Sequence, residues 1–235
     1  MPRVKLFIGN KNYSSWSMRP WVLMKEARIP FEEVMLRFDG FSPGSKFKTE
    51  IASVSGAGRV PVLVDGELHV WDSLAIAEYL AERFPDKRLW PRRTKRRARA
   101  RSVCAEMHSG FSDLRTHCPM NIDASLPEVG ARVLSEHHGV RADLDRIVML
   151  WSELLSDYGG PFLFGKFSTA DAYFAPVVMR LRTYALPVPA GIESYASEIT
   201  RLDSVSEWIR DAIAEKDFVA FEEPYRAGAS RQEVE

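Results

Sequence analysis

Three serines, Ser14, Ser15 and Ser17, stand together where a helix is expected to begin. They follow a turn-forming cluster at residues 9–12, and apolar residues at helical spacing come after them. Pro20 is acceptable in a first helical turn, where its missing N–H costs little. Hydroxyl groups and free backbone N–H groups therefore converge at the positive end of one helix, which attracts negative charge. The plainer alternative is that these serines only cap the helix.

A second group of candidate residues surrounds an expected β-hairpin. Two apolar runs, Val60–Val64 and Leu68–Trp71, flank Asp65–Gly66, a dipeptide typical of a tight turn whose two central residues both reach positive φ. Val60–Pro61 opens the hairpin at a position where no strand N–H is required and a cis bond is possible. A cis bond would turn the N–H and C=O of Val60 outward, where they could pair with an extended peptide.

The expected hairpin leads into a helix that begins at Asp72 and Ser73. These two residues supply capping oxygens, and apolar residues follow at helical spacing until Pro85. The free N–H groups at such a helix start attract a carboxylate. Together with the backbone of Val60, this helix start forms a pair of sites that suits a small acidic peptide.

The Val-Pro, hairpin, acid-Ser, helix arrangement resembles the glutathione-binding half of the glutathione S-transferases. Residues 14–19, SSWSMR, are similar to the SSCSWR-type motif of zeta-like members, with Trp16 in place of the cysteine. Over most of its length the chain resembles serine-type, zeta-like bacterial members of that family. The resemblance implies that Ser14, or Ser15 as the second choice, holds the glutathione sulfur through its hydroxyl.

The same resemblance implies four residues that bind the peptide part of glutathione: Val60, Pro61, Asp72 and Ser73. Ser73 is expected to hold the γ-glutamyl carboxylate with Asp72 beside it, and Val60 is expected to pair with the cysteinyl backbone. The glycine carboxylate could meet one of three basic residues, and the sequence leaves open whether these are only solvated loop charges. They are Lys46, Lys48 and Arg59.

The implied activity is that of a glutathione transferase, which activates the glutathione thiol for attack on a small electrophile, as in detoxification. Free thiols of this kind are mostly protonated at neutral pH, so a hydroxyl donor at a helix start must favour the thiolate. Glutathione is then a cosubstrate, and no metal is expected. Two alternatives are a glutathione-dependent cis–trans isomerase of the maleylacetoacetate type and a non-catalytic glutathione-binding module. The family also implies a homodimer.

The fold expected from these patterns is α/β plus all-α. Residues 1–86 are expected to form a thioredoxin-like domain with the order β-α-β-α-β-β-α, which the resemblance selects. Prolines bracket a linker at 85–91, and residues 92–221 are expected to form an all-helical domain. In that domain Ser168-x-x-Asp171 is a capping-box pattern that starts a buried helix. The chain from Phe218 onward is expected to be a poorly ordered polar tail.

Several arginines of the helical domain are candidates for the acceptor site. In the family the first long helix of this domain lines the cleft, which suggests Met107, Phe111 and Arg115 for its wall, although a Met/Phe stripe is also typical of a core. Arg180 and Arg182 could meet an acidic substrate or could be ordinary surface arginines.

Two other clusters in this domain could suggest a zinc site or a nucleic-acid site, but the sequence favours neither. Cys104 and His108 have i,i+4 spacing with His117–Cys118 nearby, but no Cys-x-x-Cys or second regular pair supports a zinc site. The basic run at 92–101 lacks interleaved aromatic residues and covers a helix start, so a solvated face is expected rather than a nucleic-acid site.

Composition excludes further classes of protein. The 235 residues are 46% hydrophobic, which is enough for a sizeable core. Thirty-two basic and 32 acidic residues balance, so no overall charge favours nucleic acid or an anionic membrane. No apolar run approaches the ~18 residues of a membrane span, and the N-terminus lacks the apolar core of a signal peptide. The expected location is the cytoplasm.

Overall fold

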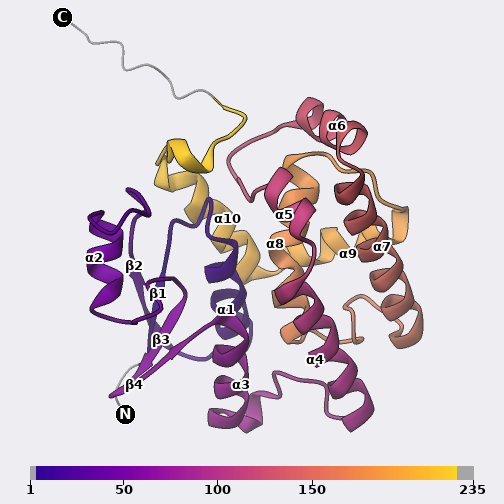
Figure 1. Ribbon diagram of the computed structural model, residues 1–235. Coiled ribbons are helices and arrows are strands. Elements are labelled where there is room, and N and C mark those ends of the chain that lie inside the picture. Colours follow the sequence, from indigo (N-terminus) through magenta and orange to yellow (C-terminus); the bar gives the residue numbers. More distant parts are fainter. Residues whose placement is uncertain (1–3, 227–235) are drawn as a thin grey trace, which may run out of the picture.

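The computed structural model describes residues 4–226 and divides them into an α/β half and a helical half (Figure 1). The α/β half has the element order β-α-β-α-β-β-α, which confirms the predicted thioredoxin-like order. Its elements are β1 (Val4–Ile8), α1 (Ser15–Glu26), β2 (Phe31–Met35), α2 (Lys46–Ala52), β3 (Val62–Asp65), β4 (Leu68–Trp71) and α3 (Ser73–Arg83).

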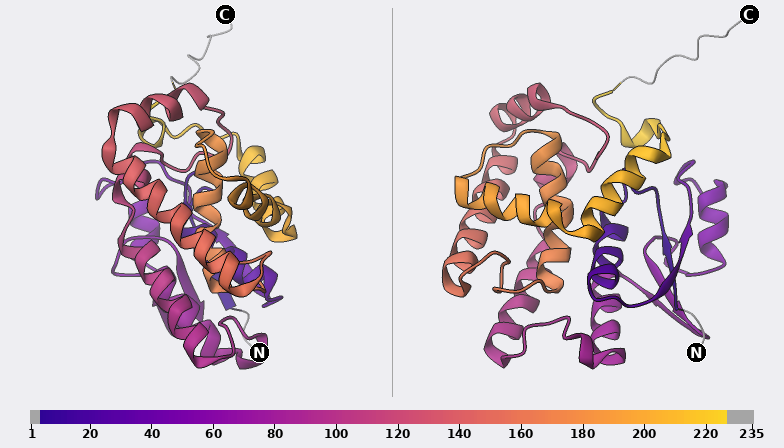
Figure 2. Two further views of the ribbon diagram at one scale, coloured as in Figure 1. Left: turned by 90° about the vertical axis from the view of Figure 1, so that its right-hand side faces the viewer. Right: turned by 180° about the vertical axis from the view of Figure 1, so that it is seen from behind.

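The four strands form one mixed sheet in the order β2-β1-β3-β4. Strand β1 pairs parallel with β2 and antiparallel with β3, and β3 pairs antiparallel with β4. Side chains alternate across β1, so Leu6 and Ile8 belong to the main core while Phe7 packs with the smaller cluster beside α2. Helix α2 covers this second face, and α1 and α3 separate the sheet from the helical half (Figure 1, Figure 2).

The hairpin between β3 and β4 turns one residue later than predicted. Asp65 still pairs with Leu68, so Gly66 and Glu67 are the central residues, and of these two only Gly66 has a positive φ. The side chain of Asp65 accepts a hydrogen bond from the Tyr79 hydroxyl at 2.8 Å. This contact with α3 holds Asp65 in the strand, and the turn falls where a single glycine suffices.

Helices make up the second half of the described chain. They are η1 (Pro85–Lys87), α4 (Thr94–Ser109), α5 (Ser112–His117), α6 (Pro127–Glu136), α7 (His138–Tyr158), α8 (Thr169–Thr183), α9 (Ala190–Arg201), α10 (Asp203–Glu215) and η2 (Ala220–Glu222). Helix α8 is buried along almost its whole length and packs against α1, so it joins the two halves. It begins with the predicted capping box of Ser168 and Asp171.

The predicted disordered tail is wrong for residues 218–226, which pack against the rest of the protein. Tyr13 donates its hydroxyl hydrogen to Glu223 at 2.6 Å, and Val219 donates its N–H to the Tyr13 oxygen at 3.3 Å. Glu223 also accepts from Asn121 and Arg226. These polar residues are ordered because each finds a partner across the fold. Residues 227–235 of the predicted tail lie outside the described part of the chain.

The structure also tests the expectations about membrane spans, metal ligands and the basic run at residues 92–101. Between residues 4 and 226, no helix has the length and apolar character needed to cross a membrane, and no three potential metal ligands converge. Burial raises the pKa of both the Cys104 and Cys118 thiols. Two residues of the 92–101 run pair with the chain's own carboxylates: Arg99 with Glu153 and Asp157, and Arg101 with Glu78 of α3.

Candidate active site

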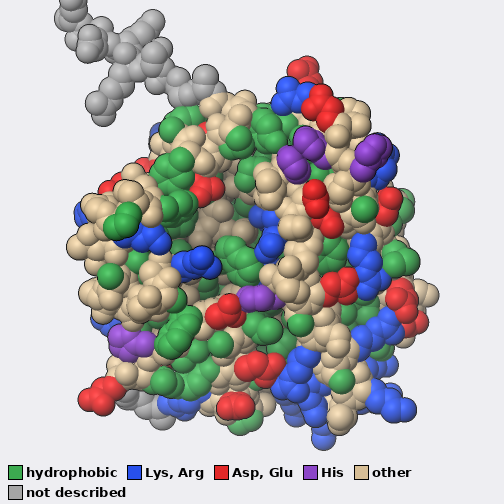
Figure 3. Space-filling view, in the orientation of Figure 1, with side chains coloured by type: hydrophobic (Ala, Val, Ile, Leu, Met, Phe, Trp, Pro, Cys, Tyr) green, Lys and Arg blue, Asp and Glu red, His purple; other side chains and the backbone are tan. Residues whose placement is uncertain are grey.

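A cavity of about 600 Å³ lies between the two halves at the start of α1. The α1 start and the segment before β3 line one side, α5 and α8 line the other, and η2 contributes Glu222. In the space-filling view the molecule is hollowed here, with Lys and Arg side chains on both sides (Figure 3). The cavity is therefore shared by both domains and is rich in positive charge.

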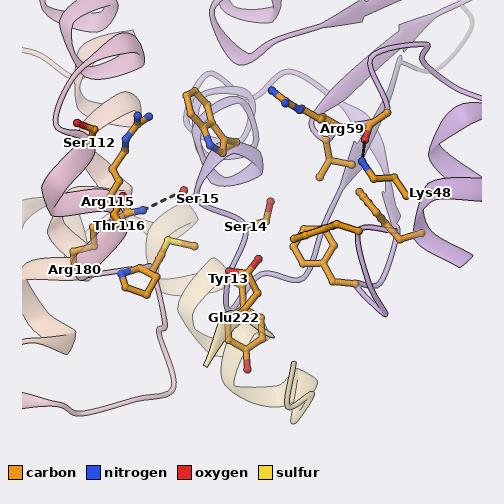
Figure 4. A pocket seen from close by; sticks show the side chains of 18 residues that line it. Tyr13, Ser14, Ser15, Lys48, Arg59, Ser112, Arg115, Thr116, Arg180 and Glu222 are labelled. Carbon is orange, nitrogen blue, oxygen red and sulfur yellow. Dashed lines mark hydrogen bonds between the residues drawn. The ribbon is translucent and has the colours of Figure 1, made fainter. Parts of the chain in front are cut away.

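Ser14 stands immediately before α1, near the centre of the cavity (Figure 4). Its side chain makes no capping hydrogen bond to the helix, so the simple capping role is not what this serine performs. Instead the Oγ atoms of Ser14 and Ser17 are hydrogen-bonded at 2.7 Å, and Ser17 Oγ accepts the Gly9 N–H at 3.2 Å. Either hydroxyl can donate in such a pair, and when Ser17 donates, the Ser14 hydrogen is available to a ligand.

Ser15 is turned toward the helical side of the same cavity (Figure 4). Its Oγ accepts a hydrogen bond from Nη2 of Arg180 at 3.4 Å. Arg180 is only 4% exposed, and its other bonds go to the backbone oxygens of Cys118 and Pro176. The two neighbouring serines thus have different surroundings, since Ser14 bonds within its own domain and Ser15 bonds across to α8.

Val60 also lines the cavity, and the Val60–Pro61 peptide bond is cis. Val60 lies before β3 begins, and within the described chain its backbone N–H and C=O make no hydrogen bond to protein. These groups are therefore available to the backbone of a bound peptide. Pro61 is buried behind Val60 and does not line the cavity.

The three basic candidates of the first domain separate into two groups. Lys48 and Arg59 line the cavity, and the Lys48 ammonium donates to the carbonyl oxygen of Gly58 at 2.7 Å. Lys46 does not line it; its side chain is 77% exposed and pairs with Glu50 one helical turn away. Two of the three therefore remain candidates for a ligand carboxylate.

Asp72 and Ser73 are not among the residues that line this cavity. Asp72 caps α3 as predicted, with Oδ1 accepting the Leu74 N–H at 2.8 Å, and its Oδ2 lies 3.2 Å from Nε2 of His108. Ser73 is 1% exposed, and its Oγ accepts from the Tyr173 hydroxyl at 3.3 Å. Both side chains are thus held by the helical domain, and Ser73 would have to leave Tyr173 to reach a ligand through its hydroxyl.

The structure separates the residues suggested for the acceptor wall. Arg115 and Arg180 line the cavity, whereas Met107 and Phe111 are packed in the main core, as their apolar spacing also allowed. Arg182 is exposed and lies outside the cavity. It is two positions after Arg180 on α8, which is more than half a helical turn, so its side chain points to the opposite side of the helix. Lining residues that were not predicted for this wall include Trp16, Ser112, Thr116, Met120 and Glu222.

Comparisons with known proteins decide the family. Residues 13–83 match the family model of the glutathione S-transferase N-terminal domain, and residues 98–211 match that of the C-terminal domain. The chain belongs to the glutathione S-transferase family. The arrangement of a thioredoxin-like domain followed by a helical domain agrees with this assignment.

Curated relatives cover much of this transferase at low identity. Glutathione S-transferase 1 from Dianthus caryophyllus is 25% identical over 179 residues, which are 75% of this chain and 76% of the relative. A stringent starvation protein A homolog from Haemophilus ducreyi is 22% identical over 210 residues, covering 88% and 89% of the two chains. A zeta-class transferase from Euphorbia esula is 24% identical over 180 residues, covering 75% of each.

Solved structures share the fold of this transferase. A glutathione transferase homologue from Burkholderia, crystallised with bound glutathione, has a TM-score of 0.67 and 23% identity, with 92% of this chain and 100% of that one covered. At this identity the likeness concerns the fold. The predicted fold class, thioredoxin-like followed by all-helical, is confirmed.

Tyr13 is another hydroxyl-bearing residue in the cavity of this transferase, and its hydroxyl is already engaged. It contacts Glu223, the backbone carbonyl of Asp217 and the N–H of Val219. Burial, followed by the hydrogen bond to Glu223, raises the pKa of Tyr13 above its ordinary value. Tyr13 therefore anchors the C-terminal segment, which leaves Ser14 and Ser15 as the cavity-lining hydroxyls at the start of α1.

The helical side of the cavity carries uncompensated positive charge. Burial, and then the nearby charges of Arg19 and Arg115, lower the pKa of Arg180 to about 10, which leaves it charged at neutral pH. The Arg19 guanidinium stacks over the Trp16 ring at 4.2 Å, and the Arg115 guanidinium lies 5.5 Å from the same ring. In the part of the chain that the structure describes, none of these arginines forms an ion pair with a carboxylate. The site is therefore suited to anionic ligands.

Proposed function

We propose that this chain is a serine-type, zeta-like glutathione transferase in which Ser14 donates a hydrogen bond to the thiolate of bound glutathione. The observation that carries this proposal is the hydrogen-bonded chain from the Gly9 N–H through Ser17 to Ser14 at the α1 start. It holds the Ser14 hydroxyl at the cavity, and when Ser17 donates within the pair the Ser14 hydrogen is free for a ligand. The motif at 14–19 supports the zeta-like assignment.

The chemistry follows from stabilising the sulfur anion. A thiol with an ordinary pKa of about 8.5 is mostly protonated at pH 7. A hydrogen bond from Ser14 and the positive end of α1 both favour the thiolate, which lowers this pKa. The thiolate then attacks an electrophilic carbon of the acceptor, a sulfur–carbon bond forms, and the leaving group departs with its electron pair. The protein contributes orientation and electrostatic stabilisation.

Glutathione would lie along the α/β side of the cavity. Its cysteinyl backbone would pair with the unused N–H and C=O of Val60, and its glycine carboxylate would meet Lys48 or Arg59. The γ-glutamyl carboxylate would bind at the start of α3, where Ser73 offers a backbone N–H and a hydroxyl that turns from Tyr173. Asp72 would receive the γ-glutamyl ammonium group beside it.

The zeta-like motif also favours one second activity. In a glutathione-dependent cis–trans isomerase of the maleylacetoacetate type, the sulfur would add to a conjugated dienone and leave again after rotation about the former double bond. The same Ser14–thiolate pair would serve, because only the fate of the adduct differs. A non-catalytic module remains the third hypothesis, and it predicts glutathione binding without a lowered thiol pKa.

We further propose that the transferase is a cytoplasmic homodimer, as its family implies. Two large apolar side chains on β4, Leu68 and Trp71, are 47% and 55% exposed. Strand β4 is an edge of the sheet, so these side chains could be covered by the helical domain of a second copy.

The test is a glutathione titration followed by turnover. Calorimetry should give saturable glutathione binding, and ultraviolet absorbance of the bound thiolate against pH should give a thiol pKa below that of free glutathione. A panel of aryl halides, with and without carboxylates, and cis-dienones should then show glutathione-dependent conjugation or isomerisation. Binding with an unshifted thiol pKa and no turnover would support the non-catalytic module instead.

A further inference from the structure

We propose that the acceptor of this transferase carries a carboxylate, and that Arg115 of α5 and Arg180 of α8 bind it beside the glutathione sulfur. The inference rests on the proposed function, since it names the substrate class of the same cavity. It starts from the two arginines on the helical side, which the proposed glutathione contacts do not use (Figure 4).

Arg180 is built into the wall as a fixed cation. It is 4% exposed, and its Nε donates to the Cys118 carbonyl at 2.9 Å while Nη1 donates to the Pro176 carbonyl at 3.1 Å. With the bond from Nη2 to Ser15, three of the five N–H groups of the guanidinium are engaged. Two N–H groups are left, and the bonds to backbone hold the plane of the guanidinium in place.

Arg115 supplies most of the remaining donors. Its Nη1 donates to the His108 carbonyl oxygen at 3.4 Å, and its Nε is buried without any partner in the described structure. Its guanidinium lies 5.5 Å from the Trp16 ring, which gives it an aromatic face to rest on. Buried donors without partners are unfavourable unless a ligand completes them. The hydroxyls of Ser112 and Thr116 line the cavity on the same helix.

Within residues 4–226 no carboxylate is ion-paired with these two arginines, and Glu222 is the one cavity-lining group that opposes their charge. Neither Arg115 nor Arg180 forms an ion pair between residues 4 and 226, although a buried cation such as Arg180 is normally paired. Glu222 is the one acidic residue found among those that line the cavity, and it lies beside Tyr13, away from Arg115 (Figure 4). Burial raises the pKa of Glu222, and this effect is larger than the opposing attraction to Arg180, so Glu222 neutralises Arg180 only in part. A carboxylate on the acceptor would supply the missing counter-charge.

A purely structural role explains Arg19 better than it explains this pair. Arg19 is 2% exposed and stacks on Trp16 and Tyr173. Its Nε and Nη1 are also without partners in the described structure, but Arg19 does not line the cavity, so an acceptor there would not reach them. Arg115 and Arg180 instead face the space where the acceptor must lie to meet the sulfur. Planar guanidinium groups of this kind match a carboxylate with two parallel hydrogen bonds.

The experiment compares two acceptors that differ only in charge at one position: 4-chloro-3,5-dinitrobenzoate and its neutral carboxamide. In both, the glutathione thiolate forms a bond to the ring carbon and chloride leaves. Each kcat/KM is divided by the uncatalysed rate constant at the same pH, which removes the difference in intrinsic reactivity. The wild type should favour the carboxylate by about tenfold or more, the effect of one charge-assisted hydrogen bond.

Three variants locate that preference. Arg115 is partly exposed, so the protein should tolerate Arg115→Gln. This variant should lower the corrected kcat/KM for the carboxylate acceptor by about tenfold or more, and that for the carboxamide by less than about twofold. Arg182→Gln is the matched control, since Arg182 is exposed on α8 outside the cavity, and it should change kcat/KM for neither acceptor. Glu222→Gln removes the opposing charge and should raise kcat/KM for the carboxylate acceptor alone. Glutathione affinity should be unchanged in Arg115→Gln, which also shows that the variant is folded.

The possible failures are distinguishable. The inference is overturned if the wild type has equal corrected kcat/KM values for the two acceptors, or if Arg115→Gln keeps the preference for the carboxylate. Either result leaves the transferase activity in place. A loss of both activities in Arg115→Gln with a raised thiol pKa would assign the arginine to the thiolate and would also overturn it. If neither acceptor reacts although glutathione binds, the proposed function itself fails, and the inference fails with it.

Discussion

Replacing Ser14 by alanine separates a transferase from a mere glutathione-binding fold. In the structure the Ser14 hydroxyl is the last member of the chain from Gly9 through Ser17, and it makes no other hydrogen bond to residues 4–226. Removing one hydrogen bond to a charged group costs about 1.5–3 kcal/mol, which corresponds to a rise of about 1–2 units in the pKa of the bound thiol. Turnover with a generic electrophile should fall by about 10²–10³, as for an oxyanion-type donor.

The fold and the glutathione affinity should be nearly unaffected by Ser14→Ala. Because Ser14 does not cap α1, the loss in folding stability is that of one neutral hydrogen bond, about 0.5–1.5 kcal/mol. The proposed contacts of glutathione with Val60 and with the α3 start do not involve Ser14. A variant that binds glutathione normally but leaves its thiol protonated is therefore the expected result.

Ser15→Ala is the matched control, because it removes a hydroxyl one residue away that bonds to Arg180 instead of Ser17. Its thiol pKa should equal that of the wild type. The measurement is ultraviolet absorbance of the enzyme-bound thiolate against pH, with turnover measured in parallel. If Ser15→Ala raises the pKa and Ser14→Ala does not, the roles of the serines are exchanged; if neither single variant nor the double variant raises it, the serine mechanism is refuted.

Three further predictions concern binding, pH and assembly. Ser73→Ala should weaken glutathione binding by about 1.5–3 kcal/mol in calorimetry. Tyr173→Phe removes only the hydroxyl that donates to Ser73, so it should not weaken binding. If Ser73→Ala binds glutathione with unchanged affinity, the γ-glutamyl carboxylate binds elsewhere. Burial raises the pKa of Asp171 to about 6 in the folded state, against about 3.9 in an unfolded chain, so the native state retains a proton that the unfolded state loses. The unfolding free energy should therefore fall by about 2 kcal/mol as pH rises from about 4 to 6, and it should level off above about pH 7. Asp171→Asn should abolish that fall in urea titrations. A free energy that rises with pH in wild type but not in Asp171→Asn would contradict the prediction. Light scattering at micromolar concentration should give about twice the chain mass, and a clean monomer would rule out the homodimer.

The sequence alone determined the features that depend on near neighbours in the chain. A Ser168–Asp171 capping box, a hairpin signalled by Asp65–Gly66, and serines before a helix each involve residues within a few positions of one another. Their physics is local, so a pattern predicts them. The hairpin turn was misplaced by one residue because the bond from Tyr79 of α3 to Asp65 is a tertiary contact.

The composition of the site was decided by tertiary structure. Ser15 and Arg180 are 165 positions apart in sequence, and only the packing of α8 against α1 brings them together. That packing also selects Arg180 over Arg182, since the two point to different sides of one helix. Likewise, the polar sequence after Phe218 predicts a disordered tail, but residues 218–226 are ordered because Glu223 accepts hydrogen bonds from Tyr13 and Asn121. A short sequence pattern cannot contain such contacts, because their partners are defined by how whole elements pack.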